Sequence, residues 1–407
     1  MKLYNQVFSF QVLKSEASVQ DLYHGVLSQI NLGQKVTGSA VLKTLTEALK
    51  KDDAIGSLGM AFSLAANLGK TEGSAIFDRI EDAIVQADEI NGKVLQFEGG
   101  LSISSQVITG AYNLAKVVGK APPISKLQSV KLANYFLSRK NVQQVKGAYS
   151  MLSALSTLAT NDFHVPVAIT LASQPAVSES SPKVKVQITD VMGNDLGSMN
   201  VQVDSAMRQS DGAVVLSKSK MKEAGSTFYE VDLMAVKPGK GFYEITLTGT
   251  PSKTNSKLAG NEGAVLLVKV LGTVSVENVE IGIADADQST AAKLTGVKHP
   301  NKLGQALKAD HHHKVILKFN VKDKASGEKV KVHQAFVKLA MKDAEIIYVA
   351  EPDTSNNYKF DLDISSKAKE FGSKSGTYSV SLIIGDAVVS NPVNWNLADI
   401  KLEFPGN

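Results

Sequence analysis

The period of the apolar residues changes once along this 407-residue chain, at Phe163, and this change limits the folds open to it. Before Phe163, apolar side chains recur every three or four positions, the spacing that places them on one face of an α-helix. After it they alternate with polar ones, as in strands that bury one face. The sequence therefore predicts a multidomain α+β protein, in which an N-terminal all-helical domain precedes a part built of strands.

The helical spacing is clearest in three stretches of the first part. Apolar residues fall at positions i, i+3, i+4 and i+7 within residues 19–30, 76–87 and 142–155. Such a stripe is typical of the buried face of an amphipathic helix. Short connections between amphipathic helices make neighbours antiparallel. Residues 1–161 are therefore predicted to form an antiparallel α-hairpin array, curved like a solenoid or toroid, with a compact bundle as the alternative.

Glycines and polar residues mark the expected ends of these helices. A residue in the left-handed conformation commonly follows the last helical turn, and glycine adopts it without strain. The helical runs are followed by Gly33, Gly69, Gly92 and Gly119. Asn141, with Gln144 three residues later, resembles an N-cap with its reciprocal partner and predicts a helix start there.

The strand-rich part contains an internal repeat. The pattern Y-x-φ-D-L (φ, an apolar residue) begins at Tyr229 and again at Tyr358, and G-x-Y-x-φ-x-L follows from Gly241 and from Gly376. Upstream, a strand, an aspartate, a glycine and a second strand match more weakly, around Asp190 and Asp323. Two copies of one unit predict two domains of one architecture. Several short strands with turn signals between them favour tandem immunoglobulin-like β-sandwiches, at residues 162–273 and 274–407.

Two tyrosines stand at equivalent positions of the repeat. Tyr243 and Tyr378 each follow a corner and begin a strand. Immunoglobulin-like sandwiches often place a tyrosine there, whose hydroxyl binds the backbone of the corner. We predict this role for both, the alternative being that they are ordinary residues of amphipathic strands.

Composition excludes several classes of function. The formal net charge of +4 is too small for a nucleic-acid footprint unless the charges cluster. The best cluster is Lys218, Lys220 and Lys222, but Glu223 follows it and a solvated strand face explains it better. The chain has no cysteine, which excludes disulfides, thiolate zinc sites and cysteine nucleophiles.

The run His311–His313 after Asp310 invites a metal interpretation. On an extended segment only His311 and His313 would share a face. A structural zinc site needs four ligands at motif spacing, so a polar loop before a strand is the better account. Asp285 and Asp287 form a D-x-D pair without the glycine and glutamate of a calcium loop, and a solvated turn is expected there.

Other polar clusters also fit structural roles. Residues 238–241, Pro-Gly-Lys-Gly, precede a strand rather than open a helix, so a turn is predicted and not a phosphate loop. The densest acidic group of the helical part fits a solvated helix face; it comprises Glu81, Asp82, Asp88 and Glu89. No serine-hydrolase, zinc-protease or Walker motif is present. The sequence therefore predicts no catalytic, cofactor-binding or metal site.

The single tryptophan, Trp395, follows Asn391 and Pro392. Proline removes a ladder donor and marks a strand start or edge. The apolar residues after Trp395 do not alternate cleanly, which predicts a bulge near Ala398 and Asp399. We expect a buried anchor rather than a platform for a sugar ring.

The sequence also bears on membranes and glycosylation. Its most apolar runs are of strand length, far below the ~20 residues that span a bilayer. The first residues are too polar for a convincing signal peptide. Every asparagine lacks serine or threonine two positions later, so no N-linked glycan is expected.

Literal strings near the C-terminus carry a resemblance to a known family. They are VAEPD at 349–353, YKFDLD at 358–363, SGTY at 375–378, LIIGDA at 382–387, and NP at 391–392 followed by W-N-x-A-D at 395–399. Weaker anchors lie earlier, LQFEGGL at 95–101 and FHVPV at 163–167. With these strings in this order the chain resembles the luminal region of the ribophorin II family, the second subunit of the eukaryotic oligosaccharyltransferase.

The resemblance implies a non-catalytic, architectural subunit on the luminal side of the endoplasmic reticulum membrane. The complex transfers an oligosaccharide from dolichyl pyrophosphate to asparagine of nascent proteins, and its chemistry resides in another subunit. Expected partners are ribophorin I and that catalytic subunit, with no cofactor and no nucleic acid. Family members carry a signal, a further N-terminal luminal stretch and C-terminal membrane spans, so the chain is expected to be a luminal fragment or a truncated gene model. Membrane association is expected only through those spans.

Two alternatives come from other classes of protein. The first is an extracellular carbohydrate-binding or adhesion protein with tandem β-sandwich modules, which an aromatic content of only 6% disfavours. The second is a hydrolase with a helical catalytic domain and β appendages, which would need inward-facing carboxylates on the helical part.

Overall fold

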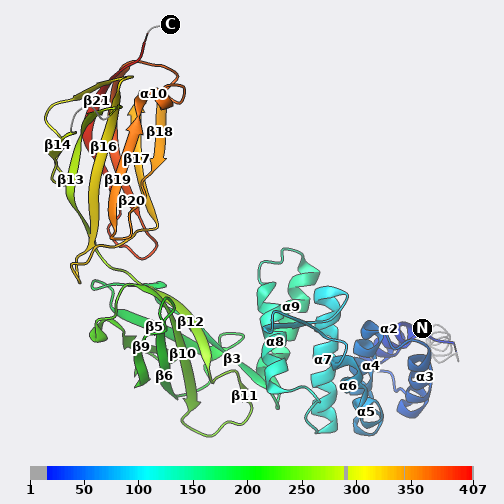
Figure 1. The fold of residues 1–407 in the computed structure, drawn as a ribbon. Coiled ribbons are helices and arrows are strands. Elements are labelled where there is room, and N and C mark those ends of the chain that lie inside the picture. Colours follow the sequence, from blue (N-terminus) through cyan, green and yellow to red (C-terminus); the bar gives the residue numbers. More distant parts are fainter. Residues whose placement is uncertain (1–15, 288–291, 343, 406–407) are drawn as a thin grey trace.

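Helices occupy the first part of the computed structural model and strands the rest, as Figure 1 shows. The structure describes residues 16–287, 292–342 and 344–405. Buried apolar side chains of these residues form three separate clusters, one among the helices and one in each half of the strand-rich part. The α+β class with N-terminal helices is therefore confirmed, and three domains fit this arrangement.

The helical region contains eight described helices of six to nineteen residues and one short hairpin. In chain order they are α2 (Val19–Asn31), α3 (Gly38–Lys51), α4 (Ile55–Leu68), α5 (Lys70–Phe77), α6 (Arg79–Ile84), the strands β1 (Asp88–Ile90) and β2 (Val94–Gln96), α7 (Gly100–Val118), α8 (Lys126–Ser138) and α9 (Val145–Thr160).

Local signals explain where several helices start and end. Ser18 and Ser125 form capping boxes with Asp21 and Gln128, so two backbone N–H groups are satisfied at each helix start. Gly119 follows α7 in the left-handed conformation, at φ 78°. By contrast, α9 begins after Gln144, whose side chain caps no backbone group, so the expected capping pair of Asn141 and Gln144 is wrong.

The prediction of an all-helical domain over residues 1–161 needs a correction, because strands β1 and β2 pair antiparallel. Asn91 and Gly92 form their turn with positive φ values of 52° and 68°. Asn-Gly is among the strongest short hairpin signals, since both residues tolerate left-handed backbone. Gly92 therefore belongs to a hairpin turn. The prediction that it marks the end of a helix is wrong.

The apolar stripe expected on the last helix is also largely wrong. Val145, Tyr149 and Leu152 are 87%, 73% and 48% exposed. The residues of α9 that are buried are Met151, Ala154, Leu155 and Leu158. Because α9 carries apolar residues on more than one face, periodicity could not decide which face would pack against α7.

The first β region contains two five-stranded sheets that share one apolar core. One has the order β4-β12-β10-β6-β7 and the other β11-β3-β5-β9-β8. The strands are β3 (Val165–Leu171), β4 (Ala176–Val177), β5 (Lys183–Asp190), β6 (Met199–Arg208), β7 (Val214–Lys220), β8 (Lys222–Glu223), β9 (Phe228–Asp232), β10 (Gly241–Pro251), β11 (Leu258–Ala259) and β12 (Ala264–Val270).

The second β region also contains two sheets around its own apolar core, one of five strands and one of four. Its sheets are β15-β21-β20-β17-β18 and β14-β13-β16-β19. The strands are β13 (Val274–Asp285), β14 (Lys293–Gly296), β15 (Leu307–Asp310), β16 (His313–Asp323), β17 (Gln334–Met341), β18 (Ala344–Val349), β19 (Asn357–Asp363), β20 (Gly376–Gly385) and β21 (Val393–Glu403), with the one-turn helix α10 (Ile364–Lys367) after β19.

The two β regions match in the order of their long strands, although the sheet β11-β3-β5-β9-β8 has five strands and its counterpart β14-β13-β16-β19 has four. In each, a short strand runs parallel to the last long strand, β4 beside β12 and β15 beside β21, whereas the long strands pair antiparallel. The inner order β3-β5-β9 corresponds to β13-β16-β19. The duplication inferred from the sequence repeat therefore extends to the topology of the sheets.

The repeated tyrosines take equivalent places. The hydroxyl of Tyr243 donates to the carbonyl oxygen of Gly239 at 2.7 Å, and that of Tyr378 to the carbonyl oxygen of Lys374 at 2.9 Å. Both bonds reach four residues back to the corner, as expected. Tyr358 forms a second repeated contact, because its hydroxyl accepts from the backbone of Val332 as that of Tyr229 does from Met199.

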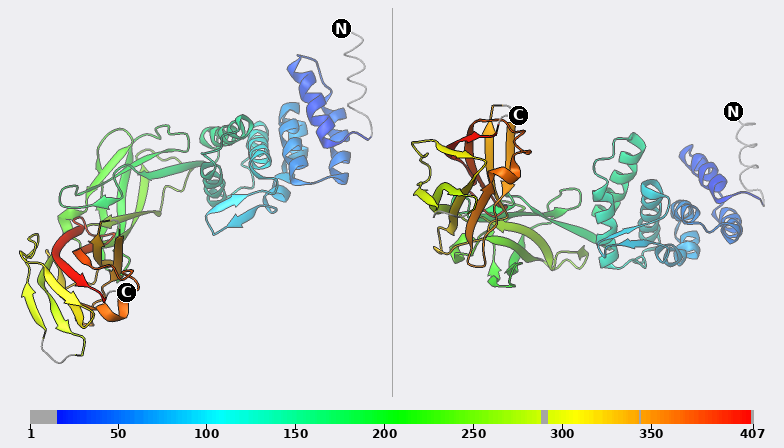
Figure 2. Two further views of the ribbon diagram at one scale, coloured as in Figure 1. Left: turned by 90° about the horizontal axis from the view of Figure 1, so that it is seen from above. Right: turned by 45° about the horizontal axis from the view of Figure 1, so that its top comes forward.

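The molecule is elongated and bent. In Figure 1 the helical region and the first β region lie along one line, and the second β region turns away from it. The two further views of Figure 2 show the same bend from other directions. No helix among the described residues is long and apolar enough to cross a membrane.

Candidate functional site at the joint between the β regions

The bend lies where β12 passes into β13, and residues 271–273 alone separate these strands. The connection is hydrogen-bonded. The backbone N–H of Gly272 donates to Val388 at 2.9 Å, and the carbonyl oxygen of Gly272 accepts from the backbone N–H of Ser390 at 2.9 Å. Gly272 thus forms a short parallel bridge with the turn before β21, and the linker is held against the second β region.

A second contact holds the start of β13. The side-chain oxygen of Asn391 accepts from the backbone N–H of Val274 at 2.8 Å, and its amide nitrogen donates to the Val274 carbonyl oxygen at 2.8 Å. One side chain therefore satisfies both backbone groups of the first residue after the linker.

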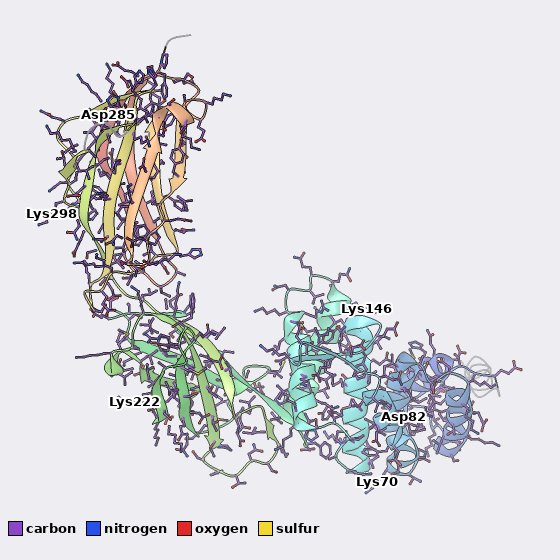
Figure 3. All side chains as sticks on the ribbon, viewed as in Figure 1. Lys70, Asp82, Lys146, Lys222, Asp285 and Lys298 are labelled. Carbon is purple, nitrogen blue, oxygen red and sulfur yellow. The ribbon has the colours of Figure 1, made fainter. Side chains whose placement is uncertain are left out.

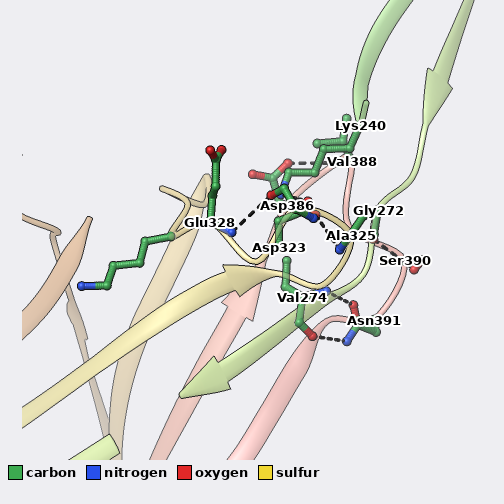
Figure 4. A network of polar contacts seen from close by, with 12 residues as sticks. Lys240, Gly272, Val274, Asp323, Ala325, Glu328, Asp386, Val388, Ser390 and Asn391 are labelled. Carbon is green, nitrogen blue, oxygen red and sulfur yellow. Dashed lines mark hydrogen bonds and ion pairs between the residues drawn. The ribbon is translucent and has the colours of Figure 1, made fainter. Parts of the chain in front are cut away.

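The third contact is an ion pair between the two β regions, drawn in Figure 4. Lys240 Nζ lies 2.7 Å from Asp323 Oδ2, and the two side chains are only 21% and 13% exposed. Lys240 belongs to the corner whose carbonyl oxygen binds Tyr243, and Asp323 is the last residue of β16. The corner before β10 in the first β region is therefore bound to the end of β16 in the second.

The turn after Asp323 is the counterpart of a turn in the first β region. Asp323 Oδ1 accepts from the backbone of Ala325 and Ser326, at 2.9 and 3.1 Å. Asp190 holds its own turn in the same way, and its second oxygen accepts from the Asn194 side chain at 2.9 Å. The second oxygen of Asp323 instead accepts from Lys240. It therefore links the two β regions, whereas the second oxygen of Asp190 binds within its own turn.

The electrostatics favour a charged Asp323. Burial alone would raise its pKa, but the hydrogen bond from Lys240, those from the backbone of Ser326 and Ala325 and the positive charge of Lys240 together hold the pKa of Asp323 below its ordinary value. A hydrogen-bonded ion pair this shielded from water is much less screened by salt than a surface pair.

Gly272 is needed for close packing rather than for an unusual backbone angle. A Cβ atom built on it would lie 3.0 Å from Cδ of Lys240 and 3.2 Å from its Cβ. The aliphatic part of Lys240 thus lies directly against the linker, on its way to Asp323. The linker, the corner and the strand end form one interlocked unit, which we call the joint: Lys240, Gly272, Val274, Asp323 and Asn391.

The helical region is also fixed to the first β region. Tyr112 of α7 lies 3.3 Å from Nδ1 of His164, and Lys257 pairs with Asp162 at 3.1 Å. Burial, with the positive charge of Lys126, lowers the pKa of His164, so the ring is neutral near pH 7. A Cβ atom on Gly260 would lie 2.9 Å from the side chain of Val130 in α8, which shows how closely the two parts pack.

The histidine run lies in a turn and not in an extended segment. Strand β15 ends at Asp310 and β16 begins at His313, and the rings of His311 and His312 lie 3.7 Å apart. The expectation that only His311 and His313 share a face assumed an extended chain and does not apply. His313 instead lies 2.7 Å from Asp310 and 3.8 Å from Asp285. Across the described ranges, no group of three such side chains has the arrangement of a metal site.

The other candidate residues are dispersed. Asp287 follows the end of β13, next to residues outside those described. Among the acidic residues of the helical region, Asp82 pairs with Arg79 at 2.6 Å and Glu89 with Lys131 at 2.7 Å. Glu81 and Asp88 are exposed, as are Lys218, Lys220 and Lys222 on β7 and β8.

Trp395 is a buried anchor, as predicted. It is 4% exposed, and its indole nitrogen donates to the Asn301 carbonyl oxygen at 2.8 Å. The register between β20 and β21 shifts so that Leu397 is the extra residue, one position before the expected bulge at Ala398 and Asp399.

The residues of the joint were not recognised as a unit from the sequence. From the sequence, Lys240 is predicted to lie in a turn, and Asp323 belongs to the weaker part of the repeat. The sequence does mark both residues as parts of repeated turns. Lys240 stands between two glycines before the corner tyrosine, and Asp323 occupies the position of Asp190 in the first copy. Their proximity depends on the angle between the regions, which no local pattern encodes.

Three models of ribophorin II domains match successive parts of this chain and together cover most of it. The family model of the ribophorin II N-terminal domain matches residues 5–159, that of the second domain residues 167–270 and that of the third domain residues 277–402. A rice relative (Oryza sativa subsp. japonica) is 25% identical over 81% of this chain and 48% of its own length. A relative from Caenorhabditis elegans is 33% identical over 35% of this chain and 51% of its own length.

Both relatives are named dolichyl-diphosphooligosaccharide–protein glycosyltransferase subunit 2. The chain spans about half the length of the curated relatives it matches. Among solved structures, the Escherichia coli adhesin FdeC is 16% identical over 57% of this chain and 64% of its own, with a TM-score of 0.25. A similarity this low carries no argument about function.

Proposed function

Since this chain belongs to the ribophorin II family, we propose that it is a non-catalytic, architectural part of the oligosaccharyltransferase complex. That complex transfers an oligosaccharide from dolichyl pyrophosphate to asparagine of nascent proteins. The observation that carries the proposal is the match of all three family domains, in order, to the three parts of this chain. The names of the two relatives point to the same complex.

The architectural role is supported by the way the parts are joined. The ion pair of the joint, the bridge at Gly272 and the contacts of Asn391 fix the angle between the β regions. Tyr112, His164 and Gly260 lie where the helices meet the first β region. A subunit that holds partners at set distances needs such joints, whereas a flexible linker would allow domain motion.

The domain boundaries are part of the proposal. Residues 1–161, 162–273 and 274–407 are proposed as folding units, the first an antiparallel α-hairpin array with one hairpin inserted and the others immunoglobulin-like β-sandwiches. Separate apolar cores, the common order of the sheets and the corner tyrosines support these assignments. The location proposed is the luminal side of the endoplasmic reticulum membrane, with ribophorin I and the catalytic subunit as partners.

The proposal is tested with the purified chain, labelled lipid-linked oligosaccharide and an acceptor peptide containing Asn-x-Ser/Thr. We expect no transfer by the chain alone and transfer by purified oligosaccharyltransferase under the same conditions. Transfer by the isolated chain that a point mutation within it abolishes would contradict a non-catalytic role.

A further inference from the structure

A long segment of the helical region contains no acidic residue. Between Glu98 and Asp162 the chain has seven basic residues and neither aspartate nor glutamate. Since the whole chain carries only +4, the remainder is net acidic. The segment comprises α7, α8 and α9, so positive charge is concentrated on the helices next to the first β region.

Exposed apolar side chains lie on the same elements. Val145, Tyr149 and Leu152 follow one another at i, i+4 and i+7 along α9 and therefore share a face. Their exposed fractions of 87%, 73% and 48% are unusual for large apolar residues of a helix whose opposite side is packed. Among residues 16–287, 292–342 and 344–405, nothing covers this apolar face.

Three basic residues adjoin that face. Arg139 and Lys140 follow the last residue of α8, and Lys146 lies in the first turn of α9. Figure 3 shows Lys146 at the upper end of the helical region. All three are exposed, and within the described parts of the chain none forms an ion pair. We call the six residues the α9 patch: Arg139, Lys140, Val145, Lys146, Tyr149 and Leu152.

The positive potential of the α9 patch is not relieved locally. Helix α9 has no acidic residue in its first turn and no side-chain cap, although a helix start favours negative charge. Lys146 instead adds positive charge there. Arg139 lies over the ring of Tyr135 at 5.2 Å, which holds its guanidinium in place. The patch therefore offers an anion a partly ordered set of donors beside an apolar stripe.

We propose that the α9 patch is the docking surface for another protein, through a segment that carries both acidic and apolar side chains. The partner segment must carry acidic side chains to complement the positive charge of the patch. It must also carry apolar side chains to cover the exposed apolar stripe. A protein is favoured over an anionic membrane because tyrosine and arginine, held on a rigid helix, are typical of protein interfaces. Three basic residues beside one short stripe are few for binding to a membrane surface.

The test uses the full chain and a short amphipathic helical peptide with glutamate on one face and leucine on the other, labelled with a fluorophore. A second peptide has lysine in place of glutamate. Anisotropy is measured for the wild-type chain, for R139E/K140E/K146E and for Y149S. The matched control is K218E/K220E/K222E, which makes the same change of charge at exposed residues of β7 and β8.

We expect the wild-type chain to bind the acidic peptide and not the basic one. Charge reversal in the patch should weaken binding at least about tenfold, or ~1.4 kcal/mol. Y149S should weaken it without changing its dependence on salt, and the control should bind like the wild type. Equal losses in both triple variants, or no binding by the wild-type chain, would overturn the proposal.

Vesicles of phosphatidylcholine with and without phosphatidylserine provide the second arm. Retention of the wild-type chain on the anionic vesicles, lost in R139E/K140E/K146E but not in the control, would replace the protein partner by a membrane.

The docking proposal and the proposed function can be contradicted independently. If a patch variant still co-purifies in full with oligosaccharyltransferase, the α9 patch does not bind a partner in that complex, and the proposed subunit role is unaffected.

Discussion

Lys240 and Asp323 belong to different β regions, and their side chains meet at 2.7 Å in the angle between them. Each also has a role within its own region, since Lys240 belongs to the corner bound by Tyr243 and Asp323 closes its own turn. The ion pair thus links two elements that are separately ordered. This explains how a connection of three residues can hold a bend.

The ion pair predicts a coupling that depends on pH. We expect K240M and D323N each to lower the free energy of unfolding, and a double-mutant cycle to give a coupling of about 1–3 kcal/mol, as for hydrogen bonds between charged groups. Because the pKa of Asp323 is held below its ordinary value, its stabilisation is complete above about pH 4 and is lost as pH falls through the folded pKa.

Urea unfolding of the wild type, the single variants and K240M/D323N at pH 7 and near pH 3 checks this coupling. The deficit of D323N should be largest at pH 7 and should shrink at the lower pH. A coupling of zero, or a deficit that grows on acidification, would show that the pair does not stabilise the joint.

Gly272 predicts a steric effect on the bend. In G272V the new side chain would enter space taken by Lys240, so we expect Lys240 to leave Asp323 and unfolding to become easier by about 1–3 kcal/mol, as in other overpacked sites. Small-angle scattering should then report a changed maximum dimension. The control is G304V, since a Cβ atom on Gly304 meets nothing within 4 Å. Unchanged scattering in both variants would contradict a tightly packed linker.

The corner tyrosines predict equal effects in the two β regions. Y243F and Y378F each leave a corner carbonyl oxygen without its hydroxyl donor, at an expected cost of about 1–2 kcal/mol. Y149F is the control, because that side chain is 73% exposed. Chemical denaturation of the three variants compares them. A cost in one region only would argue against equivalent corners.

The single tryptophan reports on the second β region. W395A should lower the free energy of unfolding by about 3–5 kcal/mol, the range for a large buried aromatic residue. W395F should cost less, because it loses mainly the hydrogen bond to Asn301. In the wild type, tryptophan emission should be blue-shifted and should move to the red as this region unfolds. An unchanged denaturation midpoint in W395A would mean that the residue does not anchor the core.

The sequence predicted those features that depend on contacts close in the chain. The corner bond of Tyr378 spans four residues and follows from the repeat. The burial of Trp395 was also predicted, because a large aromatic residue is usually an anchor in a core, although its partner Asn301 is distant in the chain. The hairpin at Asn91 and Gly92 has a clear local signal, but Gly92 also follows a helical run, which predicts a helix end instead.

Contacts between parts of the chain could not be predicted. Lys240 and Asp323 are far apart in the sequence, and their meeting depends on how one β region sits on the next. The same holds for α9, whose apolar residues could face α7 on either of two sides. Tyr149 lies on the side that packing left exposed. Periodicity shows that a helix has an apolar face, but tertiary packing selects which one is buried.

The most direct test of the subunit role is stable incorporation into the complex. The chain, with an affinity tag and a signal that directs it to the endoplasmic reticulum, is expressed in cells and recovered from gently solubilised microsomes, and the eluate is quantified by mass spectrometry. Our account predicts that the catalytic subunit and ribophorin I co-purify with it and that oligosaccharide transfer is recovered in the same fraction. Recovery of the folded chain alone, with the complex intact in the unbound fraction, would contradict it.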